Sequence, residues 1–386
     1  MNKVFFEHSV AIALLAVILV GGSVLVFPCS TFLLKDGKTL LVGHNLDERT
    51  DFPGTVFINQ RGVTKNSVSY AALMTGKSIP GPTLTWTSRY ASLTFNAFGR
   101  DFPDDGMNET GLFVGEMSYP PSRFPEDPAK PRIFICLWLQ HLLDTCETVD
   151  QVIASASALT IDGWGWHFFA ADRTGAMAVI EFLDGKVVLH RDVAMPVPVL
   201  CNEPYEYEMR RREAFLCCPA GDPVPTGEEE IPRFVQAEDM ITHYEKLAPG
   251  ERKPAVDYAF DILNALERGG TQWSFVCDLQ KLEAWFKTAT MPKIKHVALR
   301  NFRKECDKPV KFLDMNSDFA GKANARFEAY SIGANKKIVE QALAAILRIS
   351  PDFEKKIAQI GQTREKLIDR FADYPETTKC LEKGPR

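Results

Sequence analysis

The sequence predicts an α+β protein whose strands form antiparallel sheets. Apolar runs come in pairs around Asp-Gly turns, a pattern that is typical of β-hairpins. The first pair is Thr31–Leu34 and Thr39–Gly43 around Asp36-Gly37, and another hairpin is Phe182–His190. Helical segments interrupt these pairs instead of alternating with single strands, which favours α+β over a parallel α/β sheet.

Further strands follow from short apolar runs bounded by turn residues. Runs rich in Val, Ile, Phe, Trp and Thr favour a strand over a helix. The strands predicted in this way are Thr55–Asn59, Gly111–Glu116, Trp166–Ala171, Ala176–Glu181, Gln272–Asp278, Lys281–Thr288 and His296–Leu299. Together with the hairpins they account for the antiparallel sheets.

Apolar residues at helical spacing predict the helices. In the body of the chain these are Ile133–Leu143, Val149–Ala156, Arg233–Glu245 and Pro254–Ala265. Thr148 is placed to cap the helix that begins at Val149. From Ser331 onward the same spacing predicts helices over Lys336–Leu347 and Asp352–Asp373, separated by Pro351. We interpret this tail as a helical appendage packed on the body or on another subunit.

The composition excludes several classes of protein. Of 386 residues, 45% are hydrophobic and 25% are charged, as in ordinary folded proteins, which excludes collagen, a coiled coil, a polytopic membrane protein and a mostly disordered chain. A net charge of −5 gives no positive field, so we expect no nucleic-acid partner. The His are scattered, and HExxH, paired CxxC and GxGxxG motifs are missing from the sequence. We therefore expect neither a metal site nor a cofactor.

The N-terminal region predicts export. A basic start at Lys3 is followed by an uncharged apolar run over residues 10–27, as in a secretory signal. Gly21 and Ser23 place the signal-peptidase cut before Val24. The alternative is a retained membrane anchor, since this run reaches the lower limit for a spanning helix. We expect a periplasmic or secreted bacterial protein with no membrane contact once it is processed.

Cys29 is the candidate nucleophile. If processing makes Cys29 the first residue, its thiol and its α-amine have ordinary pKa values of about 8.5 and about 8. The amine then serves as the general base for the thiol, and no His is required. Because Val24–Pro28 still precedes it after the signal is cut, we expect the thiol to attack the Pro28 carbonyl and release this segment. The alternative is an ordinary buried or disulfide-bonded cysteine among the 9 in the chain.

Around this cysteine the sequence resembles the choloylglycine hydrolase family, N-terminal-nucleophile (Ntn) hydrolases that include bile salt hydrolases and penicillin V acylases. The resemblance rests on motifs in a fixed order: Cys29–Phe32, Gly43–Asp47, Asp105–Leu112, Cys201–Tyr205, Ile231–Phe234 and Trp273–Thr288. It extends from Cys29 to roughly Asn301. It implies a signal with a short pro-segment over 1–28, a catalytic domain over 29–310 and a less typical C-terminal helical extension over 311–386.

The resemblance also implies a fold and site residues. The fold is an αββα four-layer sandwich, in which two antiparallel sheets lie between helical layers. Cys29 would be the nucleophile, and Asp47 would hold its α-amine and thiol in register. Asn202 would donate its side-chain amide to the oxyanion of the tetrahedral intermediate. Arg233 would sit behind the cysteine and favour its thiolate.

Two further candidates depart from the family pattern. His44 stands where many members have Arg, so the local field is weaker or depends on pH; a structural hydrogen-bonding role is the alternative. Ser118 stands where many members have a second oxyanion-hole Asn, and its hydroxyl or a backbone N–H is expected to replace that donor. Both changes bear on the substrate more than on the reaction.

The implied function is an exported amidase that hydrolyses linear, non-peptide C–N amide bonds through a thioester. Expected substrates have an apolar acyl side: conjugated bile acids, penicillin V-like phenoxyacetyl amides or N-acyl homoserine lactones. No metal or organic cofactor is required, and the family points to a homo-oligomer, often a tetramer. The alternatives are a related cysteine acyltransferase or dipeptidase, and a membrane-anchored binding protein without enzymatic activity.

Overall fold

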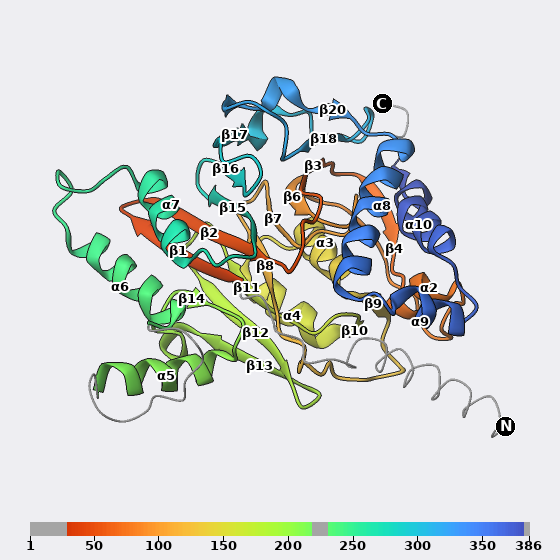
Figure 1. Cartoon of the computed structure of the whole chain (residues 1–386), viewed down its shortest axis with the longest axis horizontal. Coiled ribbons are helices and arrows are strands. Elements are labelled where there is room, and N and C mark those ends of the chain that lie inside the picture. The colour runs from red at the N-terminus through yellow and green to blue at the C-terminus, as the bar shows by residue number, and fades with distance from the viewer. Residues whose placement is uncertain (1–28, 218–230, 382–386) are drawn as a thin grey trace.

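Two large, mainly antiparallel sheets packed face to face form the centre of the protein (Figure 1). The structure is a computed structural model that describes residues 29–217 and 231–381. The first sheet has the order β14 (Val199–Leu200), β1 (Ser30–Asp36), β2 (Thr39–Asp47), β15 (Thr271–Asp278), β16 (Glu283–Thr288), β17 (Lys295–Ala298), β19 (Gly321–Lys322). The second has the order β13 (Lys186–Arg191), β12 (Met177–Leu183), β11 (Trp166–Ala171), β8 (Phe113–Ser118), β7 (Asp105–Asn108), β6 (Ser92–Asn96), β3 (Thr55–Asn59), β18 (Lys311–Asp314), β20 (Glu328–Ala329).

Aromatic side chains fill the space between the sheets. The rings of Phe95 in β6 and Phe275 in β15 are stacked with centroids 4.0 Å apart, and the ring of Phe113 in β8 lies 6.0 Å from that of Phe275. All three side chains are fully buried. Because side chains alternate along a strand, one set of residues in each sheet faces this core and the other set faces the helices.

Helices cover the outer face of each sheet. α6 (Arg233–Lys246) and α7 (Ala255–Leu266) pack on the first sheet, and α3 (Ile135–Thr145) and α4 (Val149–Ala158) pack on the second. This arrangement confirms the predicted αββα sandwich. α5 (Tyr205–Cys217) follows β14 along the chain and packs against α6.

Shorter elements complete the described structure. β9 (Arg132–Phe134) pairs in parallel with β10 (Thr160–Asp162), and β4 (Val63–Asn66) lies between β5 (Thr85–Thr87) and β21 (Lys379–Cys380). The remaining helices before the tail are α2 (Tyr70–Thr75) and the 3₁₀ turns η1 (Asp192–Ala194) and η2 (Leu299–Asn301). In the tail are η3 (Asn324–Arg326), α8 (Ile332–Ile349), α9 (Phe353–Gln359), α10 (Arg364–Asp373) and η4 (Tyr374–Thr377).

The local predictions agree with the structure where turns and caps set the boundaries. β1 and β2 pair around Gly37, whose φ of 59° is a conformation that favours glycine. The Thr148 side chain caps α4 by accepting a hydrogen bond from the Gln151 N–H at 3.4 Å. Both features are local in sequence, which is why the residue pattern predicts them.

Apart from α8, which begins at Ile332 and not at the expected Lys336, two predicted helices have the wrong boundaries. The helix expected from Ile133 begins only at Ile135, because Arg132–Phe134 pairs as β9 with β10. The helix expected over Asp352–Asp373 is interrupted, since Gly361 has a φ of 71° between α9 and α10. Strand pairing in the first case and a left-handed glycine in the second override the helical spacing.

The C-terminal extension over 311–386 contributes strands to both sheets before its first α-helix begins at Ile332. β18 pairs with β3 in the second sheet, and β19 pairs with β17 in the first. α8 and α10 then pack against each other. Phe371 of α10 lies 5.4 Å from Phe102 and 6.2 Å from Phe134 by ring centroids. The tail helices therefore pack on the body, one of the two arrangements expected from the sequence.

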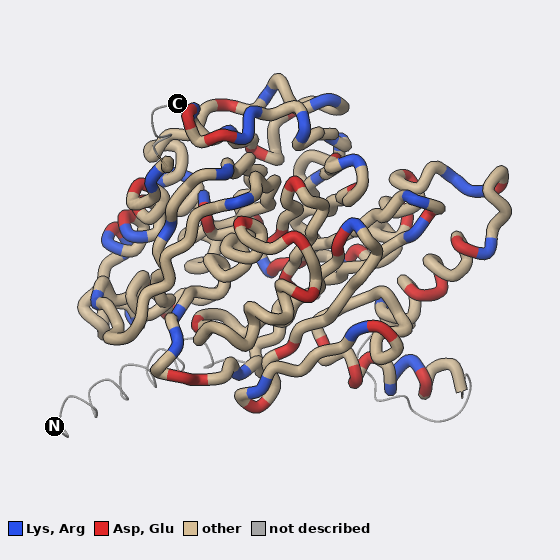
Figure 2. The backbone as a smooth tube through the Cα atoms, turned by 180° about the vertical axis from the view of Figure 1, so that it is seen from behind, with Lys and Arg blue, Asp and Glu red and all other residues tan. Residues whose placement is uncertain are grey.

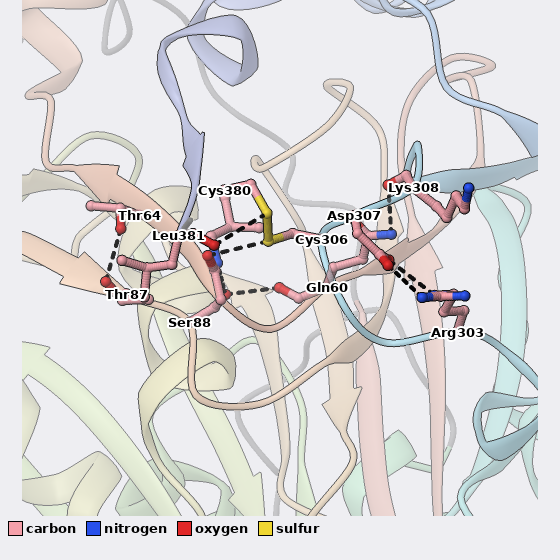
Figure 3. Close-up of a disulfide and its surroundings, with 12 residues drawn as sticks. Gln60, Thr64, Thr87, Ser88, Arg303, Cys306, Asp307, Lys308, Cys380 and Leu381 are labelled. Carbon is pink, nitrogen blue, oxygen red and sulfur yellow. Dashed lines mark hydrogen bonds and ion pairs between the residues drawn. A yellow bond between two sulfur atoms is a disulfide. The ribbon is translucent and has the colours of Figure 1, made fainter. Parts of the chain in front are cut away.

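A disulfide between Cys306 and Cys380 ties the end of the tail to the body (Figure 3). The two Cα atoms are 5.6 Å apart and 74 positions apart in the sequence. Next to the bridge, the Leu381 N–H donates to the Gly62 carbonyl at 2.8 Å. The bridge joins two of the cysteines whose pairing the sequence left open.

Charge is interspersed over the described chain. Figure 2 shows Lys and Arg interspersed with Asp and Glu along the backbone. Within the ranges 29–217 and 231–381, no helix has the length and apolar character needed to cross a bilayer. The apolar run over 10–27, on which the export prediction rests, lies outside these ranges.

Candidate active site

Cys29 lies directly before β1, a strand flanked by β14 on one side and β2 on the other (Figure 1). Its side chain is 2% exposed, and its sulfur forms no disulfide. The Sγ atom lies 3.9 Å from the Asp47 carbonyl oxygen at the end of β2. The thiol is therefore reduced, buried and next to one of its expected partners.

The pairing of β1 with β14 brings Asn202 near the start of β1, which Cys29 precedes. Thr31 is paired with Leu200 in the β1–β14 ladder, and the Leu33 N–H donates to the Pro198 carbonyl in the same register. Cys29 directly precedes β1 and Asn202 follows β14 by two residues, so both lie where this antiparallel pair of strands ends. Asn202 thus comes from a different part of the chain to the edge of the candidate site.

The Asn202 side chain also joins the two sheets. Its Nδ2 atom donates to the Ser118 carbonyl at 2.7 Å, and Ser118 is the last residue of β8. An amide nitrogen carries two hydrogens, so the second N–H is available to an oxyanion. The Ser118 hydroxyl forms no hydrogen bond within the described residues. Its backbone, rather than its hydroxyl, makes the observed contact with Asn202.

Arg233 holds the backbone of the cysteine. It is the first residue of α6, and its Nη1 atom donates to the Cys29 carbonyl at 2.8 Å and to the Ser30 Oγ at 2.6 Å. The guanidinium is buried. Both contacts fix the start of β1 in place. Ser30, which shares this contact, was not among the predicted site residues.

Asp47 is a buried carboxyl group with one fixed partner. Its Oδ1 atom accepts a hydrogen bond from the Thr271 hydroxyl, and its Oδ2 atom has no hydrogen-bond partner in the described structure. Burial raises the pKa of Asp47 to about 7, while Thr271 and Arg233 act to lower it. Thr271 was missed because only the pairing of β15 with β2 brings it to Asp47.

The surroundings of the thiol oppose its ionisation. Burial, followed by the carboxyl groups of Glu116 and Asp47, raises the pKa of the Cys29 thiol well above its ordinary value. Glu116 is buried in β8 and was also missed, since a single Glu in a strand carries no sequence signal of its own. A thiol in this environment needs a base close to the sulfur to become a nucleophile.

His44 lies deeper, between the two sheets. Its Nδ1 atom is 2.6 Å from the Thr31 Oγ1, its Nε2 atom is 3.5 Å from the Asp105 Oδ2, and its ring stacks on Phe275. Burial lowers the pKa of His44 to about 3, so the ring is neutral at neutral pH. Within the described residues its polar contacts are with Thr31 and Asp105 and not with Cys29. This placement favours the structural hydrogen-bonding role.

In the two described stretches, no group of three or more His, Cys, Asp or Glu side chains is arranged to hold a metal ion. The arrangement instead combines a thiol, a nearby carboxyl group and a side-chain amide. These are the parts that nucleophilic attack on an amide carbonyl requires.

A family comparison agrees with this chemistry. Residues 29–218 match the model of the linear amide C–N hydrolases, choloylglycine hydrolase family. These residues belong to the choloylglycine hydrolase family. The chain is therefore a hydrolase of carbon–nitrogen bonds in linear amides, as the sequence predicted.

Individual relatives support the same assignment. Penicillin V acylase from Pectobacterium atrosepticum is 26% identical over 292 residues, which cover 64% of this chain and 77% of the relative. Among solved structures, penicillin V acylase from Agrobacterium tumefaciens has a TM-score of 0.66 at 22% identity, over 78% of this chain and 98% of its own. A variant of conjugated bile acid hydrolase from Clostridium perfringens has a TM-score of 0.61 at 18% identity, over 76% and 98%. The two structures identify the Ntn-hydrolase fold.

Proposed function

We propose that the chain is an exported amidase in which processing makes Cys29 the N-terminal nucleophile and its own α-amine the base. The observation that carries this proposal is the unbridged sulfur of Cys29, buried beside Asp47 and near the end of β14, which Asn202 follows. Burial and then the acidic neighbours raise the pKa of this thiol, so the thiolate does not form readily without a base. An amine on the same residue supplies the missing base without any further side chain.

The reaction follows from these positions. The α-amine takes the thiol proton, and the sulfur attacks the amide carbonyl to form a tetrahedral oxyanion. The second N–H of Asn202 donates to this oxyanion. Collapse breaks the C–N bond, the departing amine takes the proton, and a thioester to Cys29 remains. Water, deprotonated by the α-amine, then hydrolyses the thioester and releases the acid.

Processing uses the same nucleophile. After a signal cut before Val24, the Cys29 thiol attacks the Pro28 carbonyl, and the peptide bond is replaced by a thioester. Hydrolysis releases residues 24–28 and frees the α-amine. The disulfide Cys306–Cys380 supports export, because such bridges persist mainly in oxidising compartments outside the cytoplasm.

The substrate proposed is a linear amide with an apolar, preferably aromatic, acyl group, such as a penicillin V-like phenoxyacetyl amide. Trp166 lies opposite Ser118 in the β11–β8 pairing, and its ring centroid is 5.2 Å from that of Trp164. The relatives named penicillin V acylase and conjugated bile acid hydrolase support this substrate class. We propose a homo-oligomer, as in the family expectation.

N-terminal sequencing of the purified protein tests the processing step. The expected mature chain begins at Cys29, and the Cys29→Ser variant retains some processing but loses most turnover, because a hydroxyl is the poorer nucleophile. A mature chain that begins at any other residue removes the proposed base. An intact N-terminus without labelling by thiol-directed acyl probes would favour the membrane-anchored binding protein.

A substrate panel tests the reaction. Acyl amides, including phenoxyacetyl amides, bile acid conjugates and N-acyl homoserine lactones, are compared with dipeptides and with amine acceptors. We expect hydrolysis of acyl amides, with kcat for Asn202→Ala reduced by about 10²–10³-fold. Preference for dipeptides identifies a dipeptidase instead, and acyl transfer to the added amine identifies an acyltransferase.

A further inference from the structure

A fully buried carboxylate lies in the second sheet between two histidines. Glu181 of β12 is 0% exposed. Its Oε1 atom is 3.2 Å from the His167 Nδ1 of β11, and its Oε2 atom is 3.0 Å from the His190 Nε2 of β13. Burial acts to raise the pKa of Glu181, but the hydrogen bonds from the two rings outweigh it and lower that pKa to about 2. Glu181 is therefore an acceptor at neutral pH, and both rings donate to it.

Glu181 also holds the segment that carries Asn202. Its Oε1 atom accepts from the backbone N–H of Tyr205, the first residue of α5, at 2.9 Å. A carboxylate at this position is favoured by the unpaired N–H groups of a helix start. The Tyr205 hydroxyl bonds both backbone groups of Val197, at 2.9 and 3.0 Å. Only Glu203 and Pro204 separate this fixed point from Asn202.

The same cluster supports the other partner of the Asn202 amide. His167 is paired with Met117 in the β11–β8 ladder, and Ser118 is paired with Trp166. The ring of Tyr119, the residue after Ser118, stacks on His167 with centroids 5.5 Å apart. Neighbours of both residues in the Asn202–Ser118 hydrogen bond thus contact the triad of His167, Glu181 and His190: Tyr205 on the Asn202 side and Tyr119 on the Ser118 side.

We propose that Glu181, held between His167 and His190, is a positioning residue that orients the Asn202 side chain toward the reacting carbonyl. This inference rests on the oxyanion role proposed above for Asn202. Glu181 touches neither the thiol nor the oxyanion; it acts by fixing the backbone on which Asn202 stands. A small displacement of an oxyanion donor is costly, because its stabilisation depends on geometry in the transition state.

The test compares two matched amide substitutions in the processed enzyme. Glu181→Gln weakens the triad. Asp172→Asn is the control. Asp172 is also a buried carboxyl group, and it accepts a hydrogen bond at 3.0 Å from the N–H of Val149 at the start of α4. In the described structure it has no link to Asn202. We expect kcat for Glu181→Gln to fall about 10- to 100-fold with KM changed less than about twofold. Asp172→Asn should lower Tm to a similar degree and leave kcat unchanged.

A double-mutant cycle with Asn202→Ala separates this inference from the proposed function. If Glu181 works through Asn202, Glu181→Gln has little further effect on kcat in the Asn202→Ala background. Multiplicative effects, or equal kcat for Glu181→Gln and Asp172→Asn, overturn the inference. An unchanged kcat for Asn202→Ala alone rejects the oxyanion role instead. If Glu181→Gln does not fold, His190→Leu on the edge strand β13 replaces it. We expect kcat for His190→Leu to fall about threefold or more, again with little further effect in the Asn202→Ala background.

Discussion

At the scale of single residues, burial and the carboxyl groups around Cys29 decide what the thiol can do. Burial is the main reason that the pKa of the thiol is raised, and Glu116 and Asp47 raise it further. Arg233, which was expected to stabilise the thiolate, bonds the Cys29 carbonyl and the Ser30 hydroxyl. Whether the thiol can react therefore depends mainly on a nearby group that accepts its proton.

Thr271 offers a direct test of the role of Asp47. Its hydroxyl donates to the Asp47 carboxyl and acts to lower the pKa of that group. In Thr271→Val the pKa of Asp47 should rise further, so ionised Asp47 forms only at higher pH. If ionised Asp47 holds the α-amine, the acid limb of the kcat/KM profile moves to higher pH, and activity on that limb falls about tenfold for each pH unit that the limb moves. Thr271→Ser keeps the hydroxyl and should retain the parent profile; superimposable profiles for all three enzymes would contradict the role of Asp47.

At the scale of elements, the end of the tail is held by few contacts. β21 pairs with β4 at two positions only, Lys379 with Thr64 and Cys380 with Val63. Such a short strand is marginal by itself. The disulfide Cys306–Cys380, together with the Leu381–Gly62 hydrogen bond, is what fixes it (Figure 3).

Loss of this bridge should lower stability without changing the chemistry. For Cys306→Ser/Cys380→Ser we expect the free energy of unfolding to fall by about 2–4 kcal/mol, the usual contribution of a bridge that closes a long loop. The value of kcat should stay the same, since the bridge has no contact with Cys29. Denaturant unfolding with and without reductant measures the effect. Reductant should bring the parent to the level of the double variant, and an unaffected parent would show that the bridge contributes nothing.

At the scale of the whole molecule, buried carboxyl groups should control how stability depends on pH. Burial raises the pKa values of Asp47, Glu48, Asp104 and Asp162 to about 7. Between about pH 4 and pH 7 the folded chain keeps these protons while the unfolded chain loses them, so stability falls as the pH rises. His44 and His141 have lowered pKa values and act in the opposite sense, but they are two groups against four carboxyl groups.

Asp104→Asn tests this dependence. The Asp104 Oδ2 accepts from the Ala97 N–H at 2.7 Å, and an Asn oxygen can accept the same bond. Asn does not titrate, so the folded variant binds one proton fewer. The fall in the free energy of unfolding with rising pH should therefore be smaller by up to about 1.4 kcal/mol per pH unit between pH 4 and pH 7. Denaturant unfolding at pH 5, 6, 7 and 8 measures the slope. The exposed Asp352→Asn is the control, and equal slopes for the two variants would refute the assignment.

The sequence by itself determined the features that depend on neighbouring residues. The β1–β2 hairpin follows from Asp36-Gly37 and the cap of α4 from Thr148, because turn and capping rules act locally. The αββα fold and the family were implied by the resemblance of the ordered motifs around Cys29 to the choloylglycine hydrolases.

Only the tertiary structure decided which side chains meet. Arg233 reaches Cys29 across 204 positions of sequence, and Thr271 reaches Asp47 across 224. The burial of His44 and the triad around Glu181 also depend on the register between strands and the packing of one sheet on the other. Register is set by contacts between distant segments, and a one-residue shift turns every side chain to the opposite face, so local patterns do not contain this information.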